Sequence, residues 1–205
     1  MVEYLLLYEA GRDHWSPTDN RPPLEGSHFT TTYFALRALL RWGTPAQKPR
    51  IDRRAARARS WLLETEAKDT EDRVFRLWAL GEVGVKGKPL SEATSDLLRT
   101  QRSDGGWGQL DRSKSDAYAT GTALVALHLA DDLATDDSAY RRGLEFLVKT
   151  QTDDGSWHVA SRSRPIQSYF ETGFPHGKDQ FISMSATGWA TAALALACPK
   201  PQQAE

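Results

Sequence analysis

The 205-residue sequence lacks the features that mark several protein classes. Cys198 is its one cysteine, which excludes an internal disulfide framework and any metal site built from several cysteines. No apolar run reaches the roughly 18 residues that a transmembrane helix needs. Neither sign of charge dominates, because 26 Lys and Arg residues oppose 27 Asp and Glu residues and leave a net charge of -1. Since dedicated nucleic-acid-binding proteins are usually basic, we expect no nucleic-acid partner.

Signatures of other enzyme classes are also missing. The sequence contains no Gly-rich phosphate loop and no Gly-x-Ser-x-Gly nucleophile elbow. Its five histidines form no His-x-x-x-His pair: His14, His28, His128, His158 and His176. We therefore predict no metal and no cofactor. The N-terminal stretch "MVEYLLLYEAGRDHW" lacks the basic start and cleavage site of a signal peptide, so we predict a cytoplasmic location. The length predicts one domain over residues 1–198, followed by a short polar tail over 199–205.

What the sequence does contain is an internal repeat. Two segments, "DLLRTQRSDGGWG" and "RGLEFLVKTQTDDGSW", run from an amphipathic stretch through a glutamine and a turn to a tryptophan. Gln101 and Gln151 fall where a helix ends and carbonyls lack partners, and an amide can bond to such carbonyls. Trp107 and Trp157 would then lie over the helix ends. We interpret this pattern as a structural clamp between repeats, and incomplete copies of it occur near Trp15 and Trp61.

A second type of helix follows each of these segments. It is rich in small residues and poor in charge, as in "SDAYATGTALVALHLA" and "FISMSATGWATAALALA". A helix that is apolar nearly all round is normally buried, whereas "SAYRRGLEFLVKTQ" has the single apolar stripe of a surface helix. The chain is therefore predicted to be all-α, with outer and inner helices alternating as stacked α/α hairpins. The inner helices are expected to begin near His28, Asp69, Asp116 and Ser183.

The repeat resembles the QW motif of the squalene–hopene cyclase and oxidosqualene cyclase family. The matching residues are Arg142, Gly143, Phe146, Leu147, Gln151, Gly155 and Trp157. The resemblance implies an (α/α) toroid, the fold shared with protein prenyltransferase β-subunits. Four inner helices fall short of the roughly six pairs of a full toroid. We therefore expect a partial ring, either a piece of a longer cyclase-like protein or a protomer that closes the ring as a homodimer.

One departure from the family concerns the catalytic acid. These cyclases start by protonating an alkene with an aspartic acid from an Asp-x-Asp-Asp motif, and no such motif occurs here. The candidates are Asp116, or Glu171, His176 and Asp179 on the long segment 163–183, which interrupts the repeat and would cover the cavity mouth. A position in the first turn of a helix is expected to lower the pKa of Asp116, as for a cap, unless burial reverses this. The alternative for the segment is a loop that wraps the outside.

Aromatic residues would supply the substrate-binding surface. Their faces attract carbocations, by roughly 0.5–2 kcal/mol each. The candidates, three in the N-terminal part and three on later inner helices, are Trp15, Phe29, Tyr33, Tyr118, Phe181 and Trp189. The alternative role for all six is core packing.

Two functions remain open at this stage. The first is a terpenoid cyclase or mutase, an isomerase-type activity on a hydrophobic isoprenoid bound among the inner helices. The second is a non-catalytic scaffold that binds a protein or lipid partner on its concave face. "RIDRRAARARSW" places Arg50, Arg53, Arg54 and Arg57 on one helical face, which predicts either a solvated outer surface or peripheral contact with anionic lipid.

Overall fold

The computed structural model describes residues 1–165 and 168–198, so the expected tail at 199–205 lies outside the described residues. Within these ranges the chain forms eight α-helices. They are α1 (Val2–Leu7), α2 (His28–Trp42), α3 (Lys48–Glu64), α4 (Thr70–Glu82), α5 (Lys88–Leu98), α6 (Ala117–Asp131), α7 (Ser138–Thr150) and α8 (Gln180–Ala197). Short 3-10 turns precede α3 (Pro45–Gln47) and α8 (Gly177–Asp179). The two-residue strands β1 (Trp107–Gly108) and β2 (Ser115–Asp116) pair antiparallel just before α6.

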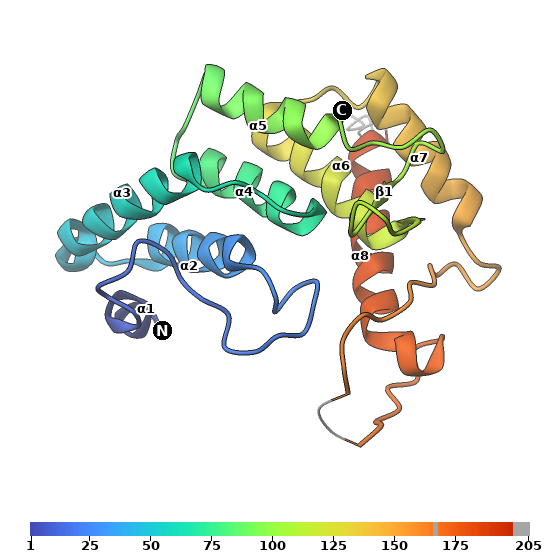
Figure 1. Cartoon of the computed structure of the whole chain (residues 1–205), viewed down its shortest axis with the longest axis horizontal. Helices are drawn as coiled ribbons and strands as arrows, with labels where there is room; N and C mark the ends of the chain where they lie inside the picture. Colours follow the sequence, from blue (N-terminus) through green and yellow to red (C-terminus); the bar gives the residue numbers. More distant parts are fainter. Residues whose placement is uncertain (166–167, 199–205) are drawn as a thin grey trace, which may run out of the picture.

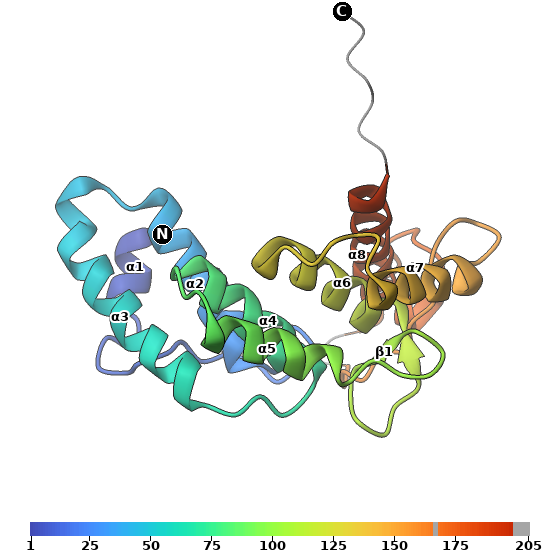
Figure 2. The same cartoon turned by 90° about the horizontal axis from the view of Figure 1, so that it is seen from above.

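The helices form two layers (Figures 1 and 2). Helices α2, α4, α6 and α8 pack side by side in chain order as the inner layer, and α3, α5 and α7 lie outside them. Every residue of α6 from Ala117 to Leu127 is buried, as the small, uncharged sequence of an inner helix requires. Outer helix α7 buries one stripe: Tyr140, Gly143, Phe146 and Leu147. The predicted all-α arrangement of stacked hairpins, forming part of a toroid, is confirmed.

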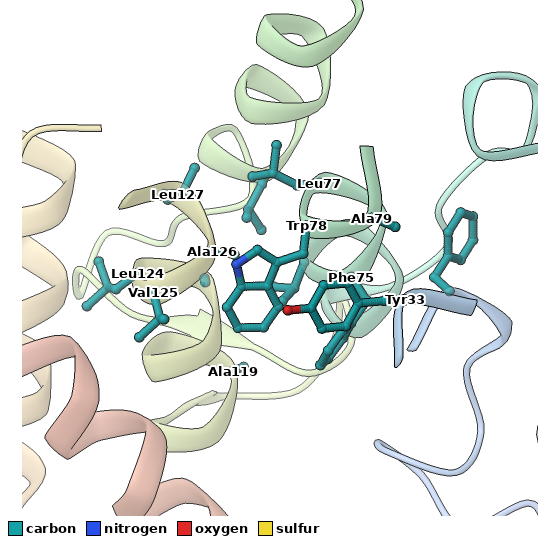
Figure 3. Packing of buried hydrophobic residues seen from close by; sticks show 14 of the residues in the cluster. Tyr33, Phe75, Leu77, Trp78, Ala79, Ala119, Leu124, Val125, Ala126 and Leu127 are labelled. Atoms are coloured by element: carbon teal, nitrogen blue, oxygen red, sulfur yellow. The ribbon is translucent and has the colours of Figure 1, made fainter. Parts of the chain in front are cut away.

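The core joins the inner helices through aromatic rings (Figure 3). Tyr33 of α2 stacks on Trp78 of α4 with ring centroids 5.4 Å apart, and Phe75 packs beside both. The backbones of α6 and α8 approach each other closely, with no large side chain between them at Gly121. A Cβ atom on Gly121 would lie 2.7 Å from the carbonyl carbon of Trp189, so only glycine fits there. These contacts make the inner layer continuous.

Three tryptophans occupy equivalent positions under the helix ends. The indole N–H groups of Trp15, Trp107 and Trp157 donate to carbonyls ten residues earlier, those of Leu5, Leu97 and Leu147. The three side chains are at most 2% exposed. Each backbone N–H also donates to a threonine hydroxyl of the following inner helix: Thr32, Thr120 and Thr187. These bonds fix each turn against the next helix.

The glutamines bond as the clamp interpretation requires, with one difference. The side-chain amide of Gln101 donates to Gly105 O at 2.9 Å and to Ala139 O of α7 at 2.7 Å. It therefore links two consecutive outer helices. The oxygen of that side chain accepts from the guanidinium of Arg142 rather than from backbone amides of the next repeat. Gln151 makes the bond within its own turn, to Gly155 O at 2.9 Å.

Three of the four predicted helix starts are confirmed, and that of α8 is shifted. Asp69 and Asp116 are N-caps whose carboxylates accept from Asp72 N–H and Ala119 N–H. The cap of α2 is Ser27, one residue before His28. Helix α8 begins three residues before Ser183, because the turn at 177–179 leads directly into it. The hydroxyl of Ser183 instead accepts from Val159 N–H at 3.1 Å.

The basic face of α3 is not a free outer surface. Arg54 is 3% exposed, its guanidinium lies 3.9 Å from the centre of the Trp15 ring, and it donates to the carbonyls of Arg12 and Tyr8. Arg57 donates to Ala10 O and Arg50 pairs with Glu3. The expectation of a solvated basic face is wrong for Arg54, because this face holds the N-terminal segment. Among the described helices, none combines the length and the apolar character needed to cross a membrane.

Candidate active site

The first turns of three inner helices meet at one buried carboxyl group. Glu71 of α4 accepts from the hydroxyl of Thr30 (α2) at Oε1, over 2.8 Å, and from the hydroxyl of Tyr118 (α6) at Oε2, over 3.0 Å. All three side chains are buried. Each carboxylate oxygen therefore has a partner from a different helix, and the side chain is held in one orientation.

Local helix capping produces this convergence. Ser27, Asp69 and Asp116 cap α2, α4 and α6, so the three helices begin at the same level of the inner layer. The hydroxyl of Ser27 also donates to Asp72 at 2.7 Å, which ties the start of α2 to that of α4. Side chains two or three positions past each cap then face one another, those of Thr30, Glu71 and Tyr118.

Burial shifts the protonation of this carboxyl group. Desolvation raises the pKa of Glu71 from 4.5 to about 7, against the lowering effect of the hydrogen bonds from Thr30 and Tyr118. The nearby charges of Asp69 and Asp72 raise it further. At neutral pH this buried side chain is therefore a neutral acid for much of the time.

Two more carboxyl groups flank it. Burial raises the pKa of Asp69 and of Asp116, while the positive charge of Arg162 acts in the opposite direction on both. Gln109 connects Asp116 to Arg162, since it donates to Asp116 at 3.1 Å and accepts from Arg162 at 2.7 Å. The expected lowering of the Asp116 pKa by the helix dipole is wrong, because desolvation outweighs it. One oxygen of Asp116 accepts from Ala119 N–H as a cap and the other from Gln109.

Sequence reasoning missed Glu71. Residues Asp69-Thr70-Glu71-Asp72 form an Asp-x-Glu-Asp sequence, which differs from Asp-x-Asp-Asp by one methylene in the third residue. A search for the literal motif passes over it. The signal in the sequence was an acidic run at the expected start of an inner helix. A helix cap accounts for the carboxylate of Asp69, but capping does not account for a carboxylate at Glu71.

In segment 163–183, two of the three candidate residues, His176 and Asp179, lie close together because both contact His158. His158 donates from Nε2 to Asp179 over 2.9 Å and stacks on His176 with ring centroids 4.9 Å apart. His176 in turn contacts the hydroxyl of Ser156 at 2.7 Å. Glu171 instead bonds to Tyr169 and to Gly173 N–H. Among the described residues, the hydrogen-bond partners of Glu71 are Thr30 and Tyr118, so these three residues do not join it.

The electrostatics of two of these residues do not suit a proton donor. The hydrogen bond from Tyr169 lowers the pKa of Glu171. For Asp179, burial acts to raise the pKa, but the bonds from Ser161 N–H and His158 outweigh it and leave the pKa lowered. Both groups are therefore more firmly ionised at neutral pH than free carboxylic acids, whereas Glu71 is less so.

An aromatic groove lies along the inner helices. It has a cavity volume of about 460 Å³, and its lining includes Trp78 and Trp189, whose rings pack together with centroids 5.3 Å apart. The remaining lining residues are Tyr33, Phe34, Arg37, Gly81, Glu82, Val125, Leu129 and Ala130. Trp78 follows Glu71 by seven residues, two turns of the same helix, so the acid and the groove share one face of α4.

The predicted substrate-binding aromatics divide into three groups. Tyr33 and Trp189 line the groove. Trp15, Phe29 and Tyr118 are buried in the core, where Phe29 packs on Trp61 at 4.5 Å. Phe181 is 54% exposed and lines a second hollow of about 410 Å³ near Pro22, Leu24 and Tyr169. The described residues contain no group of three His, Cys, Asp or Glu side chains placed to hold a metal ion.

Comparison with known proteins identifies the family of the chain. The family model described as the squalene–hopene cyclase C-terminal domain matches residues 69–184, more than half of the chain. The chain belongs to this family. The match begins at Asp69, the first residue of the Asp-x-Glu-Asp sequence.

Two curated relatives are similar to part of the chain. It is 32% identical over 136 residues to a squalene–hopene cyclase of Bradyrhizobium diazoefficiens, covering 57% of this chain and 19% of that protein. It is also 32% identical over 118 residues to a drimenyl diphosphate synthase of Streptomyces showdoensis, covering 54% of this chain and 20% of that protein. The matched segment is thus about a fifth of the length of each relative.

Proposed function

We propose that the chain binds a hydrophobic isoprenoid along the concave face of its inner helices and that Glu71 protonates one of its double bonds. The activity would be that of a terpenoid cyclase of the isomerase type. One observation carries the proposal: a fully buried carboxyl group with a pKa of about 7 stands in the acidic run at the start of α4. Family membership supports the reaction class.

The chemistry requires an acid that is neutral before the reaction and shielded from water. The proton on a Glu71 oxygen moves to one alkene carbon, a C–H bond forms, and the π bond breaks to leave a cation on the adjacent carbon. The π electrons of the next double bond then close a ring. Loss of a proton from the final cation gives an isomer of the substrate, and solvent returns a proton to the Glu71 carboxylate.

Other residues would support these steps without exchanging protons with substrate. Thr30 and Tyr118 hold the two carboxyl oxygens, and both hydroxyls stabilise the carboxylate that forms. The ring faces of Trp78, Trp189 and Tyr33 in the groove would attract the developing cation, by roughly 0.5–2 kcal/mol each.

The test is incubation of the purified chain with squalene and with shorter polyprenyl substrates, followed by product analysis by gas chromatography and mass spectrometry. Glu71→Gln keeps the shape of the side chain, with an amide N–H that donates to one hydroxyl where a carboxylate oxygen accepted, but it cannot protonate the substrate. We therefore expect product formation to fall by about 100-fold or more. Glu71→Asp, which restores Asp-x-Asp-Asp, should retain more activity than Glu71→Gln. Glu145→Gln, on the exposed face of α7, is the matched control and should leave the rate unchanged.

Two outcomes would overturn the proposal. Unchanged turnover in Glu71→Gln would remove Glu71 from the chemistry, and Asp116→Asn would then be the next variant to test. Absence of both turnover and substrate-induced quenching of tryptophan fluorescence would reject the enzyme reading. That second result would favour a scaffold that binds a protein or lipid partner on the concave face.

A further inference from the structure

The chain is held in place on both sides of Arg162. The backbone N–H of Ser161 donates to Oδ1 of Asp179 over 2.9 Å. The hydroxyl of Ser163 donates to the carbonyl of Pro22 over 2.8 Å. These bonds tie the segment to the turn before α8 and to the loop before α2. Because both neighbours of Arg162 are bonded to other parts of the fold, its own backbone position is fixed.

The side chain of Arg162 is connected to the acidic groups through Gln109. Its Nε donates to Oε1 of Gln109 over 2.7 Å, and the side-chain amide of Gln109 donates to Asp116 over 3.1 Å. Gln109 is 5% exposed, and its carbonyl accepts from the N–H of Thr70, the residue after Asp69, at 3.4 Å. One buried residue thus orients the guanidinium toward the carboxyl groups that cap α4 and α6.

Arg162 brings a positive charge to a region where carboxyl groups predominate. Burial raises the pKa of Asp69 and of Asp116, and the charge of Arg162 acts in the opposite direction on both. Burial also raises the pKa of Glu71, and the charges that act on it, those of Asp69 and Asp72, are negative and raise it further. Arg162 therefore favours ionisation of the two capping aspartates, and the charge of Asp69 in turn favours a proton on Glu71. The charged and titratable groups around this cluster are Asp69, Glu71, Asp72 and Arg73 on α4, Asp116 and Tyr118 on α6, His28 on α2, and Arg162.

We propose that Arg162 is a positioning residue for the acid: it holds Asp69 and Asp116 in the ionised form, so that the proton of this cluster resides on Glu71. The role of Glu71 as the acid rests on the proposed function, whereas the position of the proton is a property of the folded chain. Asp179, a candidate acid in the sequence, acts instead by holding the segment that carries Arg162.

Carboxyl-carbon NMR titration measures the position of the proton, with Asp69→Asn, Asp116→Asn and Glu71→Gln used to assign the three resonances. Arg162→Met keeps the length of the side chain and removes its charge, and the variant is expected to fold because Arg162 is only partly buried. The titration midpoints of Asp69 and Asp116 should rise and approach that of Glu71. Arg162→Lys retains the charge and should restore most of the separation. Arg164→Met, at an exposed position two residues away, is the matched control and should leave all three midpoints unchanged.

Asp179→Ala tests the placement of Arg162 without changing Arg162 itself. Loss of a negative charge alone would lower the midpoint of Asp116, whereas release of the segment moves Arg162 away and should raise it. We expect the rise, and a lower midpoint would overturn the role of Asp179. Unchanged midpoints in Arg162→Met, or an equal change in Arg164→Met, would overturn the role of Arg162. None of these readouts depends on turnover, so this inference and the proposed function can fail separately.

Discussion

Tyr118 donates its hydroxyl hydrogen to Oε2 of Glu71 over 3.0 Å, although 47 positions separate the two residues in the sequence. The bond joins the first turns of α4 and α6, and a second bond, from Thr30, joins α2 to the same carboxyl group. A single acidic side chain thus links three inner helices. Its proton affinity is set by burial and by hydroxyl groups that come from other repeats.

Tyr118→Phe should raise the pKa of Glu71 further. The hydroxyl of Tyr118 lowers that pKa, and its removal leaves desolvation less opposed. A carboxyl-carbon NMR titration of the glutamate side chains would report the shift. Tyr140→Phe is the control, because Tyr140 bonds to Ala193 O and not to the acidic cluster. An unchanged or lower Glu71 pKa in Tyr118→Phe would contradict the prediction.

Glu71 should make the folded chain less stable as pH rises. Its pKa is 4.5 when unfolded and about 7 when folded, so the folded chain binds the proton more tightly. The stabilisation is present in full below about pH 4.5 and is lost as pH rises to about 7, a change of about 3 kcal/mol at most. Urea unfolding of the parent and Glu71→Gln, compared from about pH 5 to pH 8, checks this.

The difference in unfolding free energy between the parent and Glu71→Gln should change with pH in one direction. Asp69 and Asp116, whose pKa values are also raised by burial, affect both proteins alike. The unfolding free energy of the parent should therefore fall relative to that of Glu71→Gln as pH increases. Parallel pH profiles for the two proteins would mean that Glu71 is not the proton-binding group.

Trp157→Phe should destabilise the fold by about 1–3 kcal/mol, because Leu147 O loses its buried partner and the smaller ring leaves a gap. Thermal and urea unfolding would measure the loss. Trp42→Phe is the control, since Trp42 is 74% exposed and a smaller ring there removes little buried contact. Equal stability of the two variants would argue against a clamp role for the buried tryptophans.

Gly121→Ala should destabilise the chain by about 1–3 kcal/mol, although alanine favours helices. The added methyl group would lie 2.7 Å from Trp189 C, so α8 must move away from α6. At Gly81 of α4 the same change meets Ala130 at an ordinary contact distance of 3.6 Å. Gly81→Ala should therefore be neutral or stabilising. Urea unfolding checks this: the free energy of unfolding should fall for Gly121→Ala and should stay the same or rise for Gly81→Ala.

Local pattern was enough to predict the layers of this fold. The uncharged sequence of α6 and the single apolar stripe of α7 assign one helix to the interior and the other to the surface. Helix starts were predictable where a capping carboxylate marks them, as at Asp69 and Asp116. The start of α8 was not, because a 3-10 turn runs directly into the helix and no side chain caps it.

The sequence by itself determined the all-α class, the alternation of inner and outer helices, and the turns that end in buried tryptophans, since all three depend on spacing along the chain. Tertiary structure alone decided that Glu71 is the buried acid. Its partners Thr30 and Tyr118 come from helices on either side, and its pKa depends on the water that those helices exclude. Tertiary structure likewise turned Arg54 into a buried anchor for the N-terminal segment, because the ring of Trp15 covers it.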